Sequence, residues 1–167
     1  MIGSDNRFSA LQNSISDLLT EAYAGPPDPR ATWFVDNAPD AGIFGILAGI
    51  TAHEASTPVD SGGNAGSTIA AHAEHLRWSL ANANATFRGE PWNPDWSESW
   101  RTIRTSPSEW DWLRDDLRRQ FENLRDAIQA QEELSGEVLN GVIALIPHAA
   151  YHLGTIRQML ERVRERQ

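Results

Sequence analysis

The sequence predicts an all-α fold, a four-helix bundle with a long tryptophan-rich crossover between its second and third helices. Apolar residues recur at spacings of three and four in four long segments, which is the period of amphipathic helices. Glycine, proline and helix-capping serine residues separate these segments, and no convincing strand lies between them. At 167 residues, the chain is expected to form a single domain, residues 1–167.

The N-terminal part is predicted to hold the first long helix, from about Phe8 to Tyr23, which Gly25-Pro-Pro27 ends. In the loop that follows, we expect Trp33 and Phe34 to anchor the chain on the bundle, because large rings bury much apolar surface.

A short helix over Ala41–Ser56, with Asp40 as its N-cap, is the next predicted element. Its three glycines argue against a regular helix. Residues 60–66 are glycine-rich and predict an exposed linker.

The remaining three helices are predicted from clear start and stop signals. The second long helix runs from about Ser67 to Phe87 and ends at Gly89. The third begins at the capping sequence Ser106-Pro-Ser-Glu109 and extends to about Ala130. The fourth spans Glu137 to Arg164. Between the second and third lies the crossover, which carries Trp92, Trp96 and Trp100; these rings either pin the crossover to the bundle or wall a ligand pocket.

Composition excludes several classes of function. The net charge is −9 and every basic residue is arginine, so binding to a phosphate backbone is not expected and we expect no nucleic-acid partner. No apolar run approaches the roughly 20 residues of a membrane span, so no membrane partner is expected either. No signal peptide is readable, which makes the cytoplasm the expected compartment. The chain has no cysteine, so any metal site must use histidine or carboxylate ligands.

Two histidines in the fourth predicted helix suggest a metal site. His148 and His152 are four residues apart, which places them about 40° apart around the helix and about 6 Å apart along it. Both imidazoles can reach one point in space. Because ligating imidazoles must be neutral, bound metal is expected to dissociate as the pH falls through about 6.

The second predicted helix offers a third ligand, His72 or His75. Helical periodicity puts His72 closer to the apolar stripe, but a helix in a bundle touches two neighbours, so spacing leaves the choice open. His53 falls at the margin of its segment, where partial exposure is expected.

Competing kinds of site lack their motifs, because the chain has no HExxH, ExxH, GxSxG or glycine-rich phosphate loop. A site built only from histidine suits zinc or nickel. Three protein ligands would leave one coordination position open, as in catalytic sites.

The sequence resembles the DinB/YfiT-like family of metalloenzymes. The resemblance lies in Ser67-Thr-Ile-Ala-Ala-His-Ala-Glu-His-Leu-Arg77, in the crossover from Asp95-Trp96 to Trp100, and in His148-Ala-Ala-Tyr-His-Leu-Gly-Thr-Ile-Arg-Gln158. The family implies a four-helix bundle with one metal held by three histidines. Matched to its pattern, the ligands would be His75, His148 and His152, with His72 as the second choice for the first position.

The resemblance also implies a kind of chemistry. Relatives include thiol S-transferases and isomerases that use low-molecular-weight thiols such as bacillithiol or mycothiol, and others are described as hydrolases. The bound metal would lower the pKa of a water or a thiol on a small-molecule substrate or cofactor. Glu54, Glu74 and Asp111 are candidates for a general base by residue type alone.

Three hypotheses follow from these observations. The first is a metal-dependent transferase or hydrolase with a three-histidine site. The second is a non-catalytic bundle that binds a metal or a small ligand beneath the tryptophan-rich crossover. The third is a structural bundle, in one version a homodimer, whose histidines only make hydrogen bonds.

Overall fold

The computed structural model describes residues 4–60 and 64–166, and side chains from residue 7 onward. Within these ranges the protein is helical and contains no strand, which confirms the predicted all-α class. Residues 61–63 of the predicted linker lie outside the described residues. The helices are α1 (Ser4–Ala24), α2 (Ile43–Ala48), α3 (Ala52–Ala55), α4 (Ile69–Phe87), the 3₁₀ helix η1 (Trp96–Trp100), α5 (Pro107–Gln129) and α6 (Gly136–Arg164).

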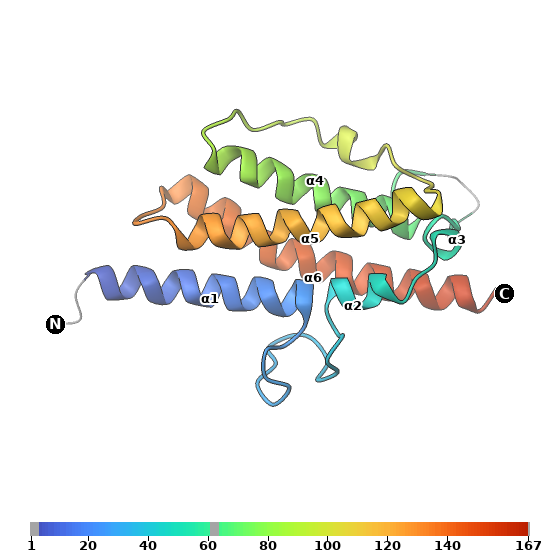
Figure 1. Ribbon diagram of the computed structural model, residues 1–167, viewed down its shortest axis with the longest axis horizontal. Coiled ribbons are helices and arrows are strands. Elements are labelled where there is room, and N and C mark those ends of the chain that lie inside the picture. Colours follow the sequence, from blue (N-terminus) through green and yellow to red (C-terminus); the bar gives the residue numbers. More distant parts are fainter. Residues whose placement is uncertain (1–3, 61–63, 167) are drawn as a thin grey trace.

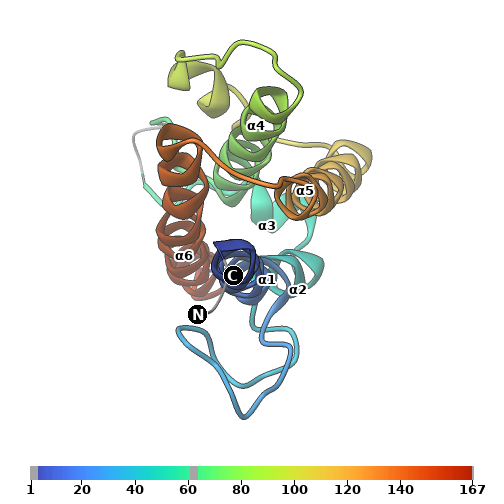
Figure 2. The same cartoon turned by 90° about the vertical axis from the view of Figure 1, so that its left-hand side faces the viewer.

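The four long helices lie side by side and enclose the core (Figures 1 and 2). Helix α4 packs against α5 and α6, and α1 packs against the same two helices. The largest fully buried side chains come from all four long helices and from α2: Leu19, Tyr23, Ile43, Leu47, Ile69, Leu76, Leu80, Trp110, Leu117, Leu124, Ile128 and Ile156. Among the described residues, no helix is both long and apolar enough to cross a membrane.

Local signals set the helix starts where the sequence predicts them. Ser106 accepts a hydrogen bond from the backbone N–H of Glu109, whose side chain returns to Ser106, so the predicted capping box of α5 is confirmed. Ser135 caps α6 with a single hydrogen bond that its side chain accepts from the N–H of Val138. Helix α6 is continuous through Pro147, and it therefore carries both His148 and His152.

The predicted helix over Ala41–Ser56 is wrong in two respects. The segment forms two short helices, because Gly49 ends α2 and Thr51 starts α3 with a capping box to Glu54. Asp40 is not the N-cap of α2, a position that Gly42 takes without a side-chain hydrogen bond. A Cβ on Gly45 would lie 2.4 Å from the carbonyl oxygen of Asp40, so this glycine allows the preceding loop to pack on α2.

Trp33 and Phe34 do not anchor the loop that holds them, because 79% of Trp33 and 40% of Phe34 are exposed. The buried carboxylate of Glu21 on α1 holds the loop instead. Its Oε1 accepts hydrogen bonds from the backbone N–H groups of Trp33, Phe34 and Val35, at 2.7, 2.9 and 3.1 Å. Charge-assisted bonds of this kind are stronger than neutral ones, so the loop is fixed through its backbone.

The crossover between α4 and α5 is tied to α4 at both ends. The side chain of Asn82 donates to the carbonyl oxygen of Asn93 at 2.8 Å and accepts from its N–H at 2.9 Å. Near the start of α4, the Thr68 hydroxyl donates to the carbonyl oxygen of Ile103 at 2.8 Å. Between these two attachments, η1 packs against α4. The crossover therefore lies over the helix that carries His72 and His75.

Candidate metal centre

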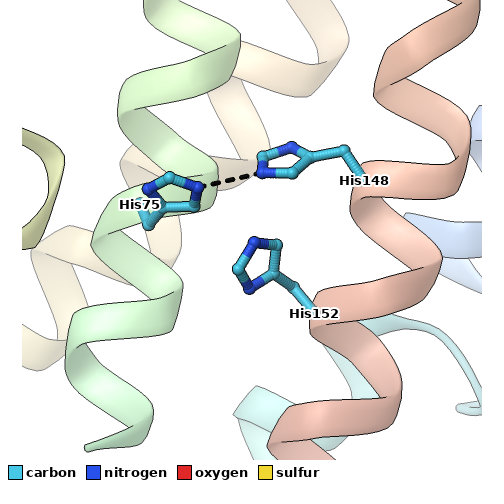
Figure 3. Close-up of side chains that lie close together, drawn as sticks. All are labelled: His75, His148 and His152. Atoms are coloured by element: carbon cyan, nitrogen blue, oxygen red, sulfur yellow. Dashed lines mark hydrogen bonds between the residues drawn. The ribbon is translucent and has the colours of Figure 1, made fainter. Parts of the chain in front are cut away.

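Three histidines from two facing helices point toward one another (Figure 3). His75 comes from α4, and His148 and His152 come from successive turns of α6. Each offers one ring nitrogen, and these three atoms all lie within 4.8 Å of one another. His75 and His152 are 5% and 3% exposed, while His148 is half-buried. This group can hold a divalent metal ion.

The spacing of the nitrogens fits a small tetrahedral ion. Zinc–nitrogen bonds of about 2.0–2.1 Å place two ligand atoms roughly 3.4 Å apart around such an ion. His75 Nε2 lies 2.9 Å from His148 Nε2, so small side-chain movements would bring this pair to ligand spacing. Two imidazole nitrogens at this distance attract only if one carries a hydrogen or a cation lies between them.

A fourth histidine, His72, lies beside this group. Its Nδ1 is 2.8 Å from Nδ1 of His152, and its Nε2 is 3.0 Å from the carbonyl oxygen of Gly66. Both His72 and His75 are buried, so both side chains point inward. Helical spacing alone leaves open which of the two is the third ligand. His75 is the one that joins His148 and His152, and His72 contacts His152 from the side.

Two tryptophans of η1 cover the histidines. The Trp100 ring stacks on His75 with centroids 4.1 Å apart and an interplanar angle of 16°. Trp96 contacts both His75 and His148, at 5.6 and 6.2 Å between centroids. These two rings therefore wall the histidine cluster. Trp110, by contrast, is buried in the core, where its indole N–H donates to the carbonyl oxygen of Ile50 at 2.8 Å.

Burial keeps the four imidazoles neutral near pH 7. The pKa of His75 is lowered to about 4, mainly by burial and in smaller part by the nearby His148 and His72. Burial is also the main cause that lowers the pKa of His152 to about 2, with His148, His72 and His75 contributing. The pKa values of His72 and His148 are lowered by burial as well. Neutral imidazole is the form that binds metal.

The three carboxylates considered as general bases are engaged elsewhere. Glu54 closes the capping box of α3 and pairs with Arg164 at 2.9 Å. Glu74 pairs with Arg77 at 2.7 Å, and Asp111 pairs with Arg114. His53 is exposed and does not belong to the histidine cluster.

Ser99 is a site residue that the sequence did not reveal. It is fully buried in η1, and its Oγ lies 2.6 Å from Nδ1 of His75 and donates to the carbonyl oxygen of Trp96 at 2.6 Å. A lone serine in a loop carries no periodic or motif signal, so only the path of the crossover places it here.

Compared with protein-family models, with curated proteins and with solved structures, the chain matches none.

Proposed function

We propose that this protein is a metal-dependent enzyme of the DinB/YfiT-like kind, acting on a small-molecule substrate as a thiol S-transferase or a hydrolase. The observation that carries the proposal is the convergence of His75, His148 and His152 within 4.8 Å. A donor set of neutral imidazoles favours zinc or nickel over magnesium or calcium, which prefer oxygen ligands.

The packing of the long helices supports the same proposal. Helices α1, α4, α5 and α6 are proposed to form a four-helix bundle, with α2 and α3 inserted in the connection between α1 and α4. In such bundles, metal sites are built from side chains on facing helices, and here the facing pair is α4 and α6.

The chain's own residues would supply positioning and exclusion of water. The three imidazoles would hold the ion and leave one coordination position for a water or a low-molecular-weight thiol. The bound metal would lower the pKa of that water or thiol, so that the group could lose its proton and act as a nucleophile near neutral pH. Trp96 and Trp100 would shield the centre from bulk water, which strengthens electrostatic interactions within it.

A second candidate function is a non-catalytic module that binds a metal or a small ligand. The observation that favours it is that Glu54, Glu74 and Asp111 all make ion pairs away from the cluster. Proton transfer in the first function would then fall to a histidine or to the metal-bound group itself.

Metal analysis of the untagged protein is the first test. We expect stoichiometric zinc or nickel in the wild type, and a loss of affinity of at least about a hundredfold in His148→Ala, because one of three ligands is removed. The matched control is His53→Ala, which removes an exposed histidine outside the cluster. Equal affinity in all three proteins would contradict the proposed site.

An activity screen separates the two functions. The metal-loaded protein is offered bacillithiol or mycothiol with an electrophile, and a panel of esters and amides. Turnover that His148→Ala abolishes supports the enzyme. Metal binding without turnover in any of these assays favours the non-catalytic module.

A further inference from the structure

The hydrogen bonds around the cluster place specific protons on the ligand histidines. A backbone carbonyl only accepts hydrogen bonds. The Nε2 of His72 lies 3.0 Å from the carbonyl oxygen of Gly66, so this nitrogen must carry the hydrogen. A neutral imidazole has one N–H. The Nδ1 of His72 therefore carries no hydrogen, and its lone pair points at His152.

The proton on His152 follows from this arrangement. Its Nδ1 lies 2.8 Å from the Nδ1 lone pair of His72, so the contact is a hydrogen bond only if His152 donates from Nδ1. The other ring nitrogen of His152, Nε2, is then unprotonated and carries a lone pair. His72 thus selects the tautomer of His152 without binding metal itself.

His75 is fixed in the same way from the crossover. The single hydroxyl hydrogen of Ser99 goes to the carbonyl oxygen of Trp96 at 2.6 Å, so Ser99 Oγ accepts from the Nδ1–H of His75 at 2.6 Å. The Nε2 of His75 is therefore unprotonated and carries a lone pair. This nitrogen lies 2.9 Å from the Nε2 of His148.

We infer that His72 and Ser99 are positioning residues that fix the Nε2 lone pairs of His152 and His75 for metal binding, each through a chain of hydrogen bonds that ends on a backbone carbonyl. His148 differs, because in the described part of the chain its Nδ1 makes no hydrogen bond. Its tautomer is free to change, so it can donate from Nε2 to His75 without metal and bind through the same atom with metal. This inference rests on the proposed metal-binding function.

The tautomers are tested first, without metal. Long-range ¹H–¹⁵N NMR spectra of the metal-free protein with ¹⁵N-labelled histidine distinguish a protonated Nδ1 from a protonated Nε2. We expect His75 and His152 as the Nδ1–H form in the wild type, and mixed tautomers for His152 in His72→Phe and for His75 in Ser99→Ala. Protonated Nε2 on His75 or His152 in the wild type would overturn the inference.

Metal affinity is the second readout, measured for zinc by competition with a chelator. Loss of a group that orients a metal ligand typically weakens binding 10–100-fold, and this loss is expected in His72→Phe and Ser99→Ala. Binding should return to within about threefold in His72→Gln, whose amide can donate to Gly66 and accept from His152, and in Ser99→Thr, which keeps the hydroxyl.

Matched controls separate this role from general destabilisation. Ser79→Ala removes another buried serine hydroxyl, one that bonds to no group among the described residues. His53→Phe removes an exposed histidine. Both variants should bind zinc like the wild type. Unchanged affinity in His72→Phe and Ser99→Ala overturns the inference and leaves the metal site standing. A His72→Gln variant as weak as His152→Ala overturns it in favour of His72 as a ligand. A wild type that binds no metal overturns the proposed function, while the spectra still decide the tautomers.

Discussion

At the scale of single residues, the burial of the histidines controls how protons compete with metal. A histidine in water has a pKa of about 6.5, and on that basis metal is expected to leave as the pH falls through about 6. In the structure, burial lowers the pKa of His75 to about 4, and that of His148 is also lowered. Protons therefore bind these nitrogens only at a more acidic pH than the sequence indicates.

This difference predicts the pH dependence of metal binding. Above the lowered pKa values the ligands are already neutral, so affinity should be nearly independent of pH; below them, each ligand must lose a proton to bind, and affinity should fall. Metal should remain bound at about pH 6 and be released as the pH approaches about 4. Dialysis at a series of pH values followed by metal analysis measures this, and full release by pH 6 would contradict the effect of burial.

At the scale of elements, the sequence predicts the long helices because their signals are local. In α5, the apolar stripe and the capping box each depend on residues that are three or four positions apart, and both are found as expected. Helix α4 shows where this reasoning fails. Every residue from Ile69 to Ala73 is buried, and so is His75, so the distance from the apolar stripe does not distinguish His72 from His75. The family resemblance, not the periodicity, favours His75.

The contacts that the sequence does not reveal depend on distant partners. Glu21 accepts a hydrogen bond from the backbone N–H of Val35 across a loop, and the spacing of these two residues does not predict this bond. The same is true of Ser99, which reaches His75 only because the crossover folds back along α4. The pair His148 and His152 was predictable because its geometry belongs to one helix, whereas the contact of Ser99 with His75 was not.

The crossover should depend on Asn82, whose side chain makes two hydrogen bonds to the backbone of Asn93. In Asn82→Ala we expect faster amide hydrogen exchange across residues 93–100 and zinc binding about tenfold weaker, because the Ser99 contact to His75 is loosened. The matched control is Asn84→Ala, since Asn84 is also buried on α4 but bonds to Gln120 on α5. Similar exchange at residues 93–100 in both variants would argue against this role.

At the scale of the whole molecule, a bound metal ion would cross-link α4 and α6, two helices that no disulfide connects. His75 and His148 are 73 residues apart in sequence, and the chain has no cysteine. A ligand that binds only the folded state stabilises it by mass action. Metal loading should therefore stabilise the packing of α4 against α6 directly.

This cross-link predicts a metal-dependent melting temperature. Free zinc at about a hundred times its Kd should add about 2.7 kcal/mol to the free energy of unfolding, which raises Tm by roughly 5–10 °C for a protein of this size. Circular dichroism melts with zinc and with a chelator measure the shift. His148→Ala should melt at the same temperature in both conditions, and a full shift in that variant would point to metal bound elsewhere.

The stacking of Trp100 on His75, with ring centroids 4.1 Å apart, gives the molecule an optical reporter of its own centre. Zinc has a filled d shell and should alter the indole emission only slightly, through the electric field it adds. Nickel has partly filled d orbitals and should quench that emission strongly at such short range. Titration of the metal-free protein, followed by fluorescence, should therefore distinguish the two proposed ions without any label. Because Trp96 also contacts the cluster, Trp100→Phe should reduce the nickel signal, and Trp96→Phe in addition should remove most of what is left while the other tryptophans still fluoresce.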